Sequence, residues 1–144
     1  MKVNPMLETV FRGASRFHAS LYRMVGGKGL LGKNTLILTT RGRKTGRPVS
    51  IPLLYVADRK RLYVVASFGG NDHPPHWYLN LTADPEVTVE IGRMSGRYRA
   101  RSLTLQESAS IWPKLLAMYP TYDAYKKRTS RVIPVIELAP IAGR

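Results

Sequence analysis

One short run of the sequence gathers residue types suited to binding an anion. Residues 41–48 read RGRKTGRP, with four cationic side chains, two glycines and one hydroxyl. Glycine permits backbone conformations in which amide groups converge on an anion, and arginine can hold phosphate or carboxylate through two parallel hydrogen bonds. The spacing differs from that of a P-loop, and no helix is predicted to follow. We therefore predict an anion-binding turn here, with a solvated basic hairpin as the alternative.

A second stretch, ASFGGNDHPPHWYLNL at residues 66–81, combines a glycine pair with an aromatic and an amide. Ser67 ends a predicted strand, and the glycines after it would let a flat ligand approach the backbone closely. Trp77 offers ring surface, although core packing is a serious alternative for it. His73 and His76 have no partnering cysteine or acidic cluster, so we predict no metal site.

The third stretch, MYPTYDAY, carries three tyrosines at a spacing of three residues, Tyr119, Tyr122 and Tyr125. On a helix they would share one edge, where their hydroxyls could donate hydrogen bonds or a proton. The alternative is a half-buried aromatic edge of the core. No cysteine, GxSxG motif or His–Asp pair supports nucleophilic catalysis, so an enzyme of this sequence would need a bound cofactor to supply the chemistry.

The elements that position these residues are mostly short strands. Strands are predicted over residues 35–40, 49–57, 61–67, 86–91, 97–103 and 133–139, with hairpin turns around 58–60 and 92–96. Helices are predicted over residues 5–25, over 76–84 with Asp72 or His73 as cap, from Thr104 past a kink at Pro113 to residue 118, and as a short helix or loop over 119–131. Because short turns join most strands, the sheet should be largely antiparallel and curled into a barrel.

Composition limits the class of protein and its partners. A chain of 144 residues, 44% of them hydrophobic, is sufficient for one domain, which we divide into a helix and linker over 1–28 and a barrel over 29–144. The absence of cysteine fits a reducing cytoplasm, and neither a signal peptide nor a membrane-spanning run is predicted. A net charge of +14, with no acidic residue between Glu8 and Asp58, predicts an anionic partner: nucleic acid, a membrane surface or a small molecule.

Taken in order, LILTTRGRKTGRP, SIPLLYV, VVASFGGNDHPPHWYLNLTADPEVTVEI and MYPTYDAYKKRTSRVIPVIEL resemble the deazaflavin-dependent nitroreductase family of actinobacteria over residues 30–140. The resemblance implies a mainly β split barrel that binds coenzyme F-420, an 8-hydroxy-5-deazaflavin with a phosphate and a polyglutamate tail. It also implies an oxidoreductase that transfers hydride from reduced F-420 to an electron-poor acceptor such as a quinone, an enone or a nitro compound.

The resemblance assigns site residues position by position. The implied cofactor-binding residues are Arg43, Lys44, Thr45, Gly46, Arg47, Pro52, Val65, Ala66, Ser67, Phe68, Gly69, Gly70, His76, Trp77 and Asn80. The implied catalytic or substrate-facing residues are Ser67, Tyr119, Tyr122 and Tyr125. Two positions depart from the family pattern, since Val49 and Phe68 stand where many members have Arg and Lys, and each change removes a cation near the cofactor.

The sequence also allows other functions and partners. The charge and aromatics also allow a nucleic-acid-binding barrel, an FMN-type flavin barrel, or a carrier of the cofactor without turnover. A homodimer is another expectation, because barrels of this type often pair. A cytoplasmic location is expected, with contact between the basic helix over 5–25 and the inner face of an anionic membrane as a further hypothesis.

Overall fold

The computed structural model describes residues 34–67 and 70–141. The helix predicted over residues 5–25 lies outside this described part, as do Phe68 and Gly69 of the predicted site. The division of the chain at residue 28 is likewise not tested.

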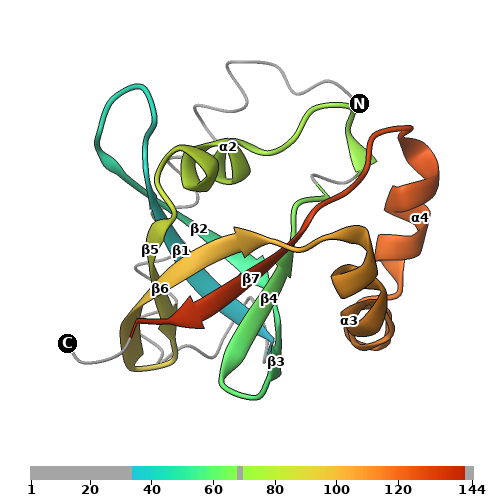
Figure 1. The fold of residues 1–144 in the computed structure, drawn as a ribbon. Helices are drawn as coiled ribbons and strands as arrows, with labels where there is room; N and C mark the ends of the chain where they lie inside the picture. The colour runs from blue at the N-terminus through green and yellow to red at the C-terminus, as the bar shows by residue number, and fades with distance from the viewer. Residues whose placement is uncertain (1–33, 68–69, 142–144) are drawn as a thin grey trace.

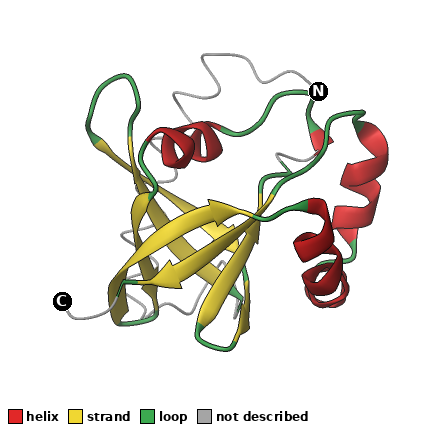
Figure 2. Ribbon diagram, in the orientation of Figure 1, coloured by secondary structure: helices red, strands yellow, loops and turns green. Residues whose placement is uncertain are grey.

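Seven strands form one curled antiparallel sheet, with its helices outside (Figures 1 and 2). The strands are β1 (Thr35–Arg41), β2 (Pro48–Leu54), β3 (Val56–Asp58), β4 (Arg61–Val65), β5 (Glu86–Ile91), β6 (Met94–Ser102) and β7 (Val135–Pro140), in the order β2-β1-β5-β6-β7-β4-β3. The helices are α2 (His76–Ala83), α3 (Leu105–Met118) and α4 (Thr121–Arg128). The prediction of a largely antiparallel, curled sheet is confirmed.

The long strand predicted over residues 49–57 is divided at Tyr55. Leu54 still pairs with Thr35 of β1, whereas Val56 pairs with Tyr63 of β4. The Tyr55 N–H donates to the carbonyl of Asn34 at 2.9 Å, which anchors the chain where it changes partner. The prediction of one strand was wrong because both halves have strand-like sequence, and only the choice of partner divides them.

Other boundaries also differ from the predictions. The strand predicted over 97–103 begins earlier, because the chain reverses at Gly92, whose φ of 60° allows Ile91 to pair with Met94. The helix cap predicted at Asp72 or His73 is wrong: the N-cap of α2 is Pro75, without a side-chain hydrogen bond. The capping box of Thr104 and the helix through Pro113 are confirmed in α3.

The two faces of the sheet bury different clusters, as the alternation of a strand requires. Leu62 and Val64 of β4 pack inside the barrel, while Tyr63 and Val65 pack against α3 and α4 outside. The inner cluster comprises Leu36, Leu38, Leu62, Val64, Ala66, Trp77, Leu81, Val87, Val89, Ala100, Ile136 and Leu138. The outer cluster comprises Tyr63, Val65, Ile111, Leu115, Tyr122 and Val135.

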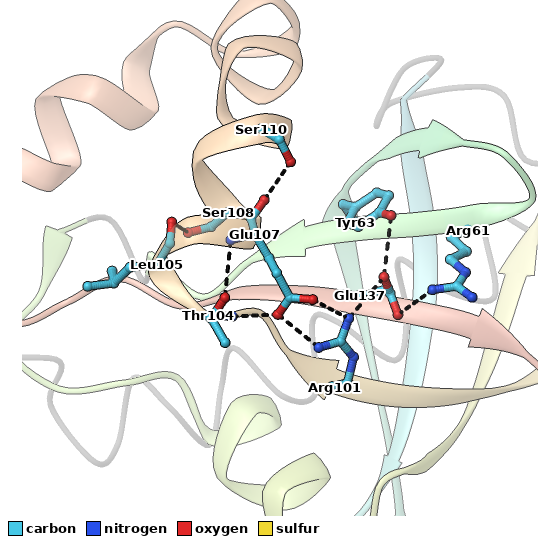
Figure 3. Close-up of polar contacts among 9 residues, drawn as sticks. All are labelled: Arg61, Tyr63, Arg101, Thr104, Leu105, Glu107, Ser108, Ser110 and Glu137. Carbon is cyan, nitrogen blue, oxygen red and sulfur yellow. Dashed lines mark hydrogen bonds and ion pairs between the residues drawn. The ribbon is translucent and has the colours of Figure 1, made fainter.

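A buried carboxylate ties three strands together on the outer face (Figure 3). Glu137 of β7 is 6% exposed and accepts from Arg61 of β4 at 3.1 Å and from Arg101 of β6 at 3.4 Å. Tyr63 donates its hydroxyl to the same carboxylate at 3.4 Å. Burial, followed by the charge of Glu137, raises the pKa of Tyr63. The two arginines therefore compensate the burial of this acid.

The network continues from Arg101 to the start of α3. Both terminal nitrogens of Arg101 donate hydrogen bonds to the Glu107 carboxylate at 2.9 Å, and Glu107 also accepts from the Thr104 N–H at 2.9 Å (Figure 3). The Arg101 hydrogen bond, aided by Thr104, lowers the pKa of Glu107 to about 2. The charged form of Glu107 thus fixes the first turn of α3 to β6.

We expect this ion pair to weaken as pH falls. A carboxyl whose pKa is lower in the folded state stabilises the fold above its unfolded pKa of about 4.3, and the stabilisation disappears as pH approaches the folded value. Glu107→Gln should therefore lower the melting temperature at pH 6, and the difference from the parent should narrow between pH 5 and pH 2. Thermal denaturation across that range tests it, and a difference independent of pH would contradict it.

Candidate active site

The loop between β1 and β2 is closed by its own backbone. Gly42 donates its N–H to the carbonyl of Arg47 at 2.8 Å, and Gly46 donates to the carbonyl of Gly42 at 2.8 Å. A Cβ on Gly42 would lie 2.7 Å from the Thr45 hydroxyl, so glycine is needed there for space. The sequence prediction of a compact glycine turn is therefore correct, and the loop extends from the barrel beside α2 (Figure 1).

The expectation that several amides of this loop converge on an anion is wrong for most of them. Besides the two glycine amides, the Arg43 N–H donates to Asn80 Oδ1 at 3.2 Å, and the Arg47 N–H donates to Thr45 Oγ1 at 3.2 Å. Within the described part of the chain, the amides of Lys44 and Thr45 make no hydrogen bond, and the side chains of Lys44 and Arg47 meet no acidic group. Anion binding by the loop must therefore depend mainly on these two exposed cations.

Arg43 joins the loop to α2. Its Nη1 donates to Asn80 Oδ1 at 2.9 Å, and its Nη2 lies 3.2 Å from His76 Nδ1. Because guanidinium has only donors, Nδ1 of His76 must be the acceptor in this contact. Asn80 is 4% exposed and uses its amide nitrogen to donate to Thr40 Oγ1 of β1 at 3.2 Å. Residues predicted from two separate stretches of sequence therefore form one cluster, in which Arg43 orients the loop.

The turn after β4 lies against α4. Gly70 has a φ of +78° and donates its N–H to the carbonyl of Ser67 at 2.9 Å. A Cβ on Gly70 would lie 2.9 Å from both the Tyr125 carbonyl oxygen and Arg128 Cβ. Only glycine allows the backbone of α4 to pack this closely. The second and third predicted stretches are thereby also in contact.

The three predicted tyrosines form one cluster beside that turn. The hydroxyls of Tyr119 and Tyr125 are 3.0 Å apart, and the Tyr119 and Tyr122 rings meet edge to face with centroids 4.8 Å apart. Tyr122 is 5% exposed, and this burial raises its pKa; the hydrogen bond between Tyr119 and Tyr125 is the main cause of a raised pKa at Tyr125. Tyr122 and Tyr125 are therefore protonated at neutral pH, and Tyr119 and Tyr125 are the two with partly exposed side chains.

Three of the remaining predicted residues lie in strands or directly after one. Pro52 of β2 is half-buried opposite Ile37, while Val65 and Ala66 are buried at the end of β4. Trp77 is 5% exposed and belongs to the inner core cluster, which agrees with the alternative considered for it. Among the described residues no group of three or more metal-ligating side chains occurs. In the same residues, no helix has the length and apolar character needed to cross a membrane.

The cationic loop and the tyrosine cluster share no hydrogen bond in the described structure, and they lie at opposite sides of the barrel end (Figure 1). Both are found at the end of the sheet where β1 finishes and β4 gives way to the Ser67 turn. A ligand contacting both must therefore be elongated, with an anionic part near Lys44 and Arg47 and another part near Tyr119 and Tyr125.

One residue of this region was missed by the sequence analysis. Arg131, between α4 and β7, donates from Nε to the Asn71 carbonyl at 2.8 Å and from Nη2 to the carbonyls of Ala66 and Ser67 at 3.2 and 2.9 Å. Nothing in the sequence distinguishes it from neighbouring cations, because its partners are backbone atoms about sixty residues away.

The fold is a split barrel of the kind found in cofactor-dependent reductases. Residues 14–140 match the model of the F-420H(2)-dependent quinone reductase family. The chain belongs to this family, whose cofactor is coenzyme F-420. The predictions of a deazaflavin-dependent oxidoreductase and of its cofactor are confirmed.

Two relatives from Mycobacterium tuberculosis support this assignment. One is 33% identical over 132 residues, covering 85% of this chain and 87% of the relative, and is named an F-420H(2)-dependent quinone reductase. The other is 40% identical over 106 residues, covering 74% of this chain and 89% of the relative, and carries the same name as an unproven assignment.

Two solved structures share the fold. An F-420-H2 dependent reductase, FDR-A, has a TM-score of 0.69 and 34% identity, with 74% of this chain and 94% of that chain covered. A protein described as a domain-swapped dimer has a TM-score of 0.70 and 30% identity, with 88% of this chain and 98% of that chain covered.

Proposed function

We propose that this protein transfers hydride from reduced F-420 to a quinone. The observation that carries the proposal is the arrangement at one end of the barrel: two exposed cations that meet no acidic group among the described residues, on a loop closed by backbone hydrogen bonds, and a pair of tyrosine hydroxyls beyond the Ser67 turn. An elongated cofactor with an anionic tail and a flat ring would place its tail at the cations and its ring near the tyrosines. The names of the relatives support a quinone as acceptor.

The residues present fit the cofactor by their chemistry. Lys44 and Arg47 would hold the phosphate and the glutamate tail through charge-assisted hydrogen bonds. The ring would lie near Pro52, the end of β4 and the Ser67 turn. When bound, F-420 supplies the hydride. The protein supplies position and electrostatics.

The tyrosines would act on the acceptor. Reduction of a quinone places negative charge on oxygen, which a nearby hydroxyl donor can stabilise. The Tyr119–Tyr125 pair offers such a donor, because both residues are partly exposed and one of the two hydroxyls donates to the other while the second remains free to donate. Tyr122 is buried and its ring supports that of Tyr119, so we assign it a supporting role.

Titration of the purified protein with oxidised F-420, followed by fluorescence, tests the cofactor. Oxidation of reduced F-420 in the presence of menadione then tests the acceptor. We expect saturable binding and turnover with menadione, and weaker responses with FMN and with generic single-stranded DNA. Binding of FMN or DNA in preference to F-420 would overturn the proposal in favour of one of those partners. Binding without turnover of menadione, enones or nitro compounds would indicate a carrier.

Two finer proposals concern assembly and location. We propose a homodimer, on the support of the domain-swapped dimer with the same fold, and sedimentation of the purified protein tests it. We also propose that residues 1–25 bring the protein to an anionic membrane from the cytoplasm. Their deletion should then reduce co-sedimentation with anionic liposomes, and unchanged partitioning would remove the idea.

Asn80 should matter for cofactor binding through Arg43. Asn80→Ala removes the acceptor of two Arg43 hydrogen bonds and the donor to Thr40. The bond from the Arg43 guanidinium is charge-assisted, and a bond of this kind is worth about 1.5–3 kcal/mol. Because the loop retains its internal closure, we expect only a partial effect, a rise of about tenfold in the Kd for F-420, which corresponds to about 1.4 kcal/mol. Thr82→Ala, an exposed change on the same helix, is the control. Equal affinity for Asn80→Ala and parent would contradict the coupling.

A further inference from the structure

Arg131 holds both ends of the turn that follows β4. Its guanidinium donates to Ala66 and Ser67 before the glycine pair and to Asn71 after it, at 2.8 to 3.2 Å. The donor in each bond is charged, which strengthens it, and Arg131 forms no salt bridge with a described acidic residue, although the charge of Asp72 acts on it. The three bonds hold the backbone of Ala66, Ser67 and Asn71 from one side.

The same arginine links that turn to the segment carrying the tyrosines. Thr129, two residues earlier, accepts from the Arg131 N–H at 3.3 Å and donates to Asp72 at 3.2 Å. The backbone of α4 also packs directly on Gly70. The position of Tyr125 relative to Ser67 therefore depends on contacts centred on Arg131.

Arg131 also determines which way the Ser67 amide faces. The planar trans peptide directs the Ser67 N–H opposite to the Ala66 carbonyl, and that carbonyl accepts from Arg131. The Ser67 N–H therefore points away from Arg131, and it donates to no group within the described structure. A cation bound to the carbonyl side of a peptide polarises its N–H into a stronger donor. Ser67 is 7% exposed, so this donor lies in a largely water-excluded setting.

We propose that Arg131 is a positioning residue for hydride transfer, holding the Ser67 amide and the Tyr119–Tyr125 pair in one fixed relation around the reacting groups. This inference rests on the proposed function. We expect the loss of Arg131 to reduce turnover more than it weakens binding of the F-420 tail, because Arg131 contacts the turn and not the Lys44 loop.

Arg131→Ala and Arg131→Lys test the proposal. Displacements of about 1 Å near reacting groups can cost about a hundredfold in rate, so we expect Arg131→Ala to lower kcat by about 10- to 100-fold while its Kd for F-420 changes by less than about threefold. Arg131→Lys should remain impaired, because one ammonium cannot reach three carbonyls with the geometry of a guanidinium. Added ethylguanidinium should restore part of the turnover of Arg131→Ala and leave Arg131→Lys unchanged.

Arg61→Ala is the matched control. It also removes a guanidinium, but one that lies at the opposite end of β4 from Ser67 and bonds to Glu137 of β7. In cofactor-free protein, hydrogen–deuterium exchange should become faster over residues 66–72 and 119–128 in Arg131→Ala and not in Arg61→Ala. Parent-like exchange and kcat in Arg131→Ala would overturn the inference; should that variant not fold, a folded Arg131→Lys with parent-like kcat would do so. A parent protein that neither binds nor oxidises reduced F-420 would instead remove the proposed function, while the exchange comparison would still report on the turn.

Discussion

Replacing Lys44 and Arg47 together by alanine should raise the Kd for F-420 by about 30-fold at low ionic strength. Each exposed cation contributes about 1 kcal/mol when it contacts an anionic group, and about 2 kcal/mol in total corresponds to this factor. The effect should shrink as salt is added, because the screening length falls to about 10 Å at 0.1 M. Fluorescence titrations at several salt concentrations measure both quantities.

The turn between β3 and β4 offers a matched control for this double variant. Arg59 and Lys60 are also exposed and without an acidic partner in the described structure, so their replacement by alanine changes the net charge equally. Strand register places this turn at the end of the sheet opposite the Lys44 loop (Figure 1). An equal loss of affinity in both double variants would show that only overall charge matters, and would contradict a local site.

Among the described glycines, Gly70 should be the one whose substitution by alanine lowers the stability of the fold most. Left-handed backbone costs about 1–2 kcal/mol for a residue with a Cβ. The new Cβ would also lie 2.9 Å from backbone and side-chain atoms of α4, and overpacking of this kind adds about 1–3 kcal/mol. We therefore expect a loss of about 2–5 kcal/mol in the free energy of unfolding, together with loss of turnover as α4 and its tyrosines are displaced.

Gly46→Ala separates the two contributions to that cost. Gly46 has a similar φ of +72°, yet a Cβ there would meet nothing within 4 Å. This variant should lose only the conformational part, about 1–2 kcal/mol. Denaturant unfolding of both variants measures the difference, and equal losses would show that α4 does not pack on Gly70 as described.

Local chemistry made much of the fold predictable. The capping box of Thr104 and Glu107 and the alternating strands depend on residues close in sequence, and they are found as expected. The three clusters of the site were also recognisable, because glycine, cation and tyrosine patterns each fall within a few residues. Which clusters touch could not be predicted, since Gly70 against α4 and Arg43 against Asn80 join positions far apart in the chain.

The errors have the same origin. Tyr55 divides a strand without any breaking residue, because the division reflects a change of partner from β1 to β4. The loop amides were expected to be available, but Gly42, Arg47, Thr45 and Asn80 accept from four of them. Arg131 donates to backbone carbonyls, and because every residue has one, the sequence does not indicate which carbonyls it contacts.

The place of β7 within the sheet has a consequence for synthesis of the protein on the ribosome. Residues 135–140 pair with β6 on one side and β4 on the other, so the hairpin of β3 and β4 has no neighbour on its β4 side until they emerge. Arg131 precedes them by only four residues. A nascent chain that has not yet exposed β7 leaves the strand edges of β4 and β6 open to other chains, so chaperone protection is most valuable until β7 has emerged from the ribosome.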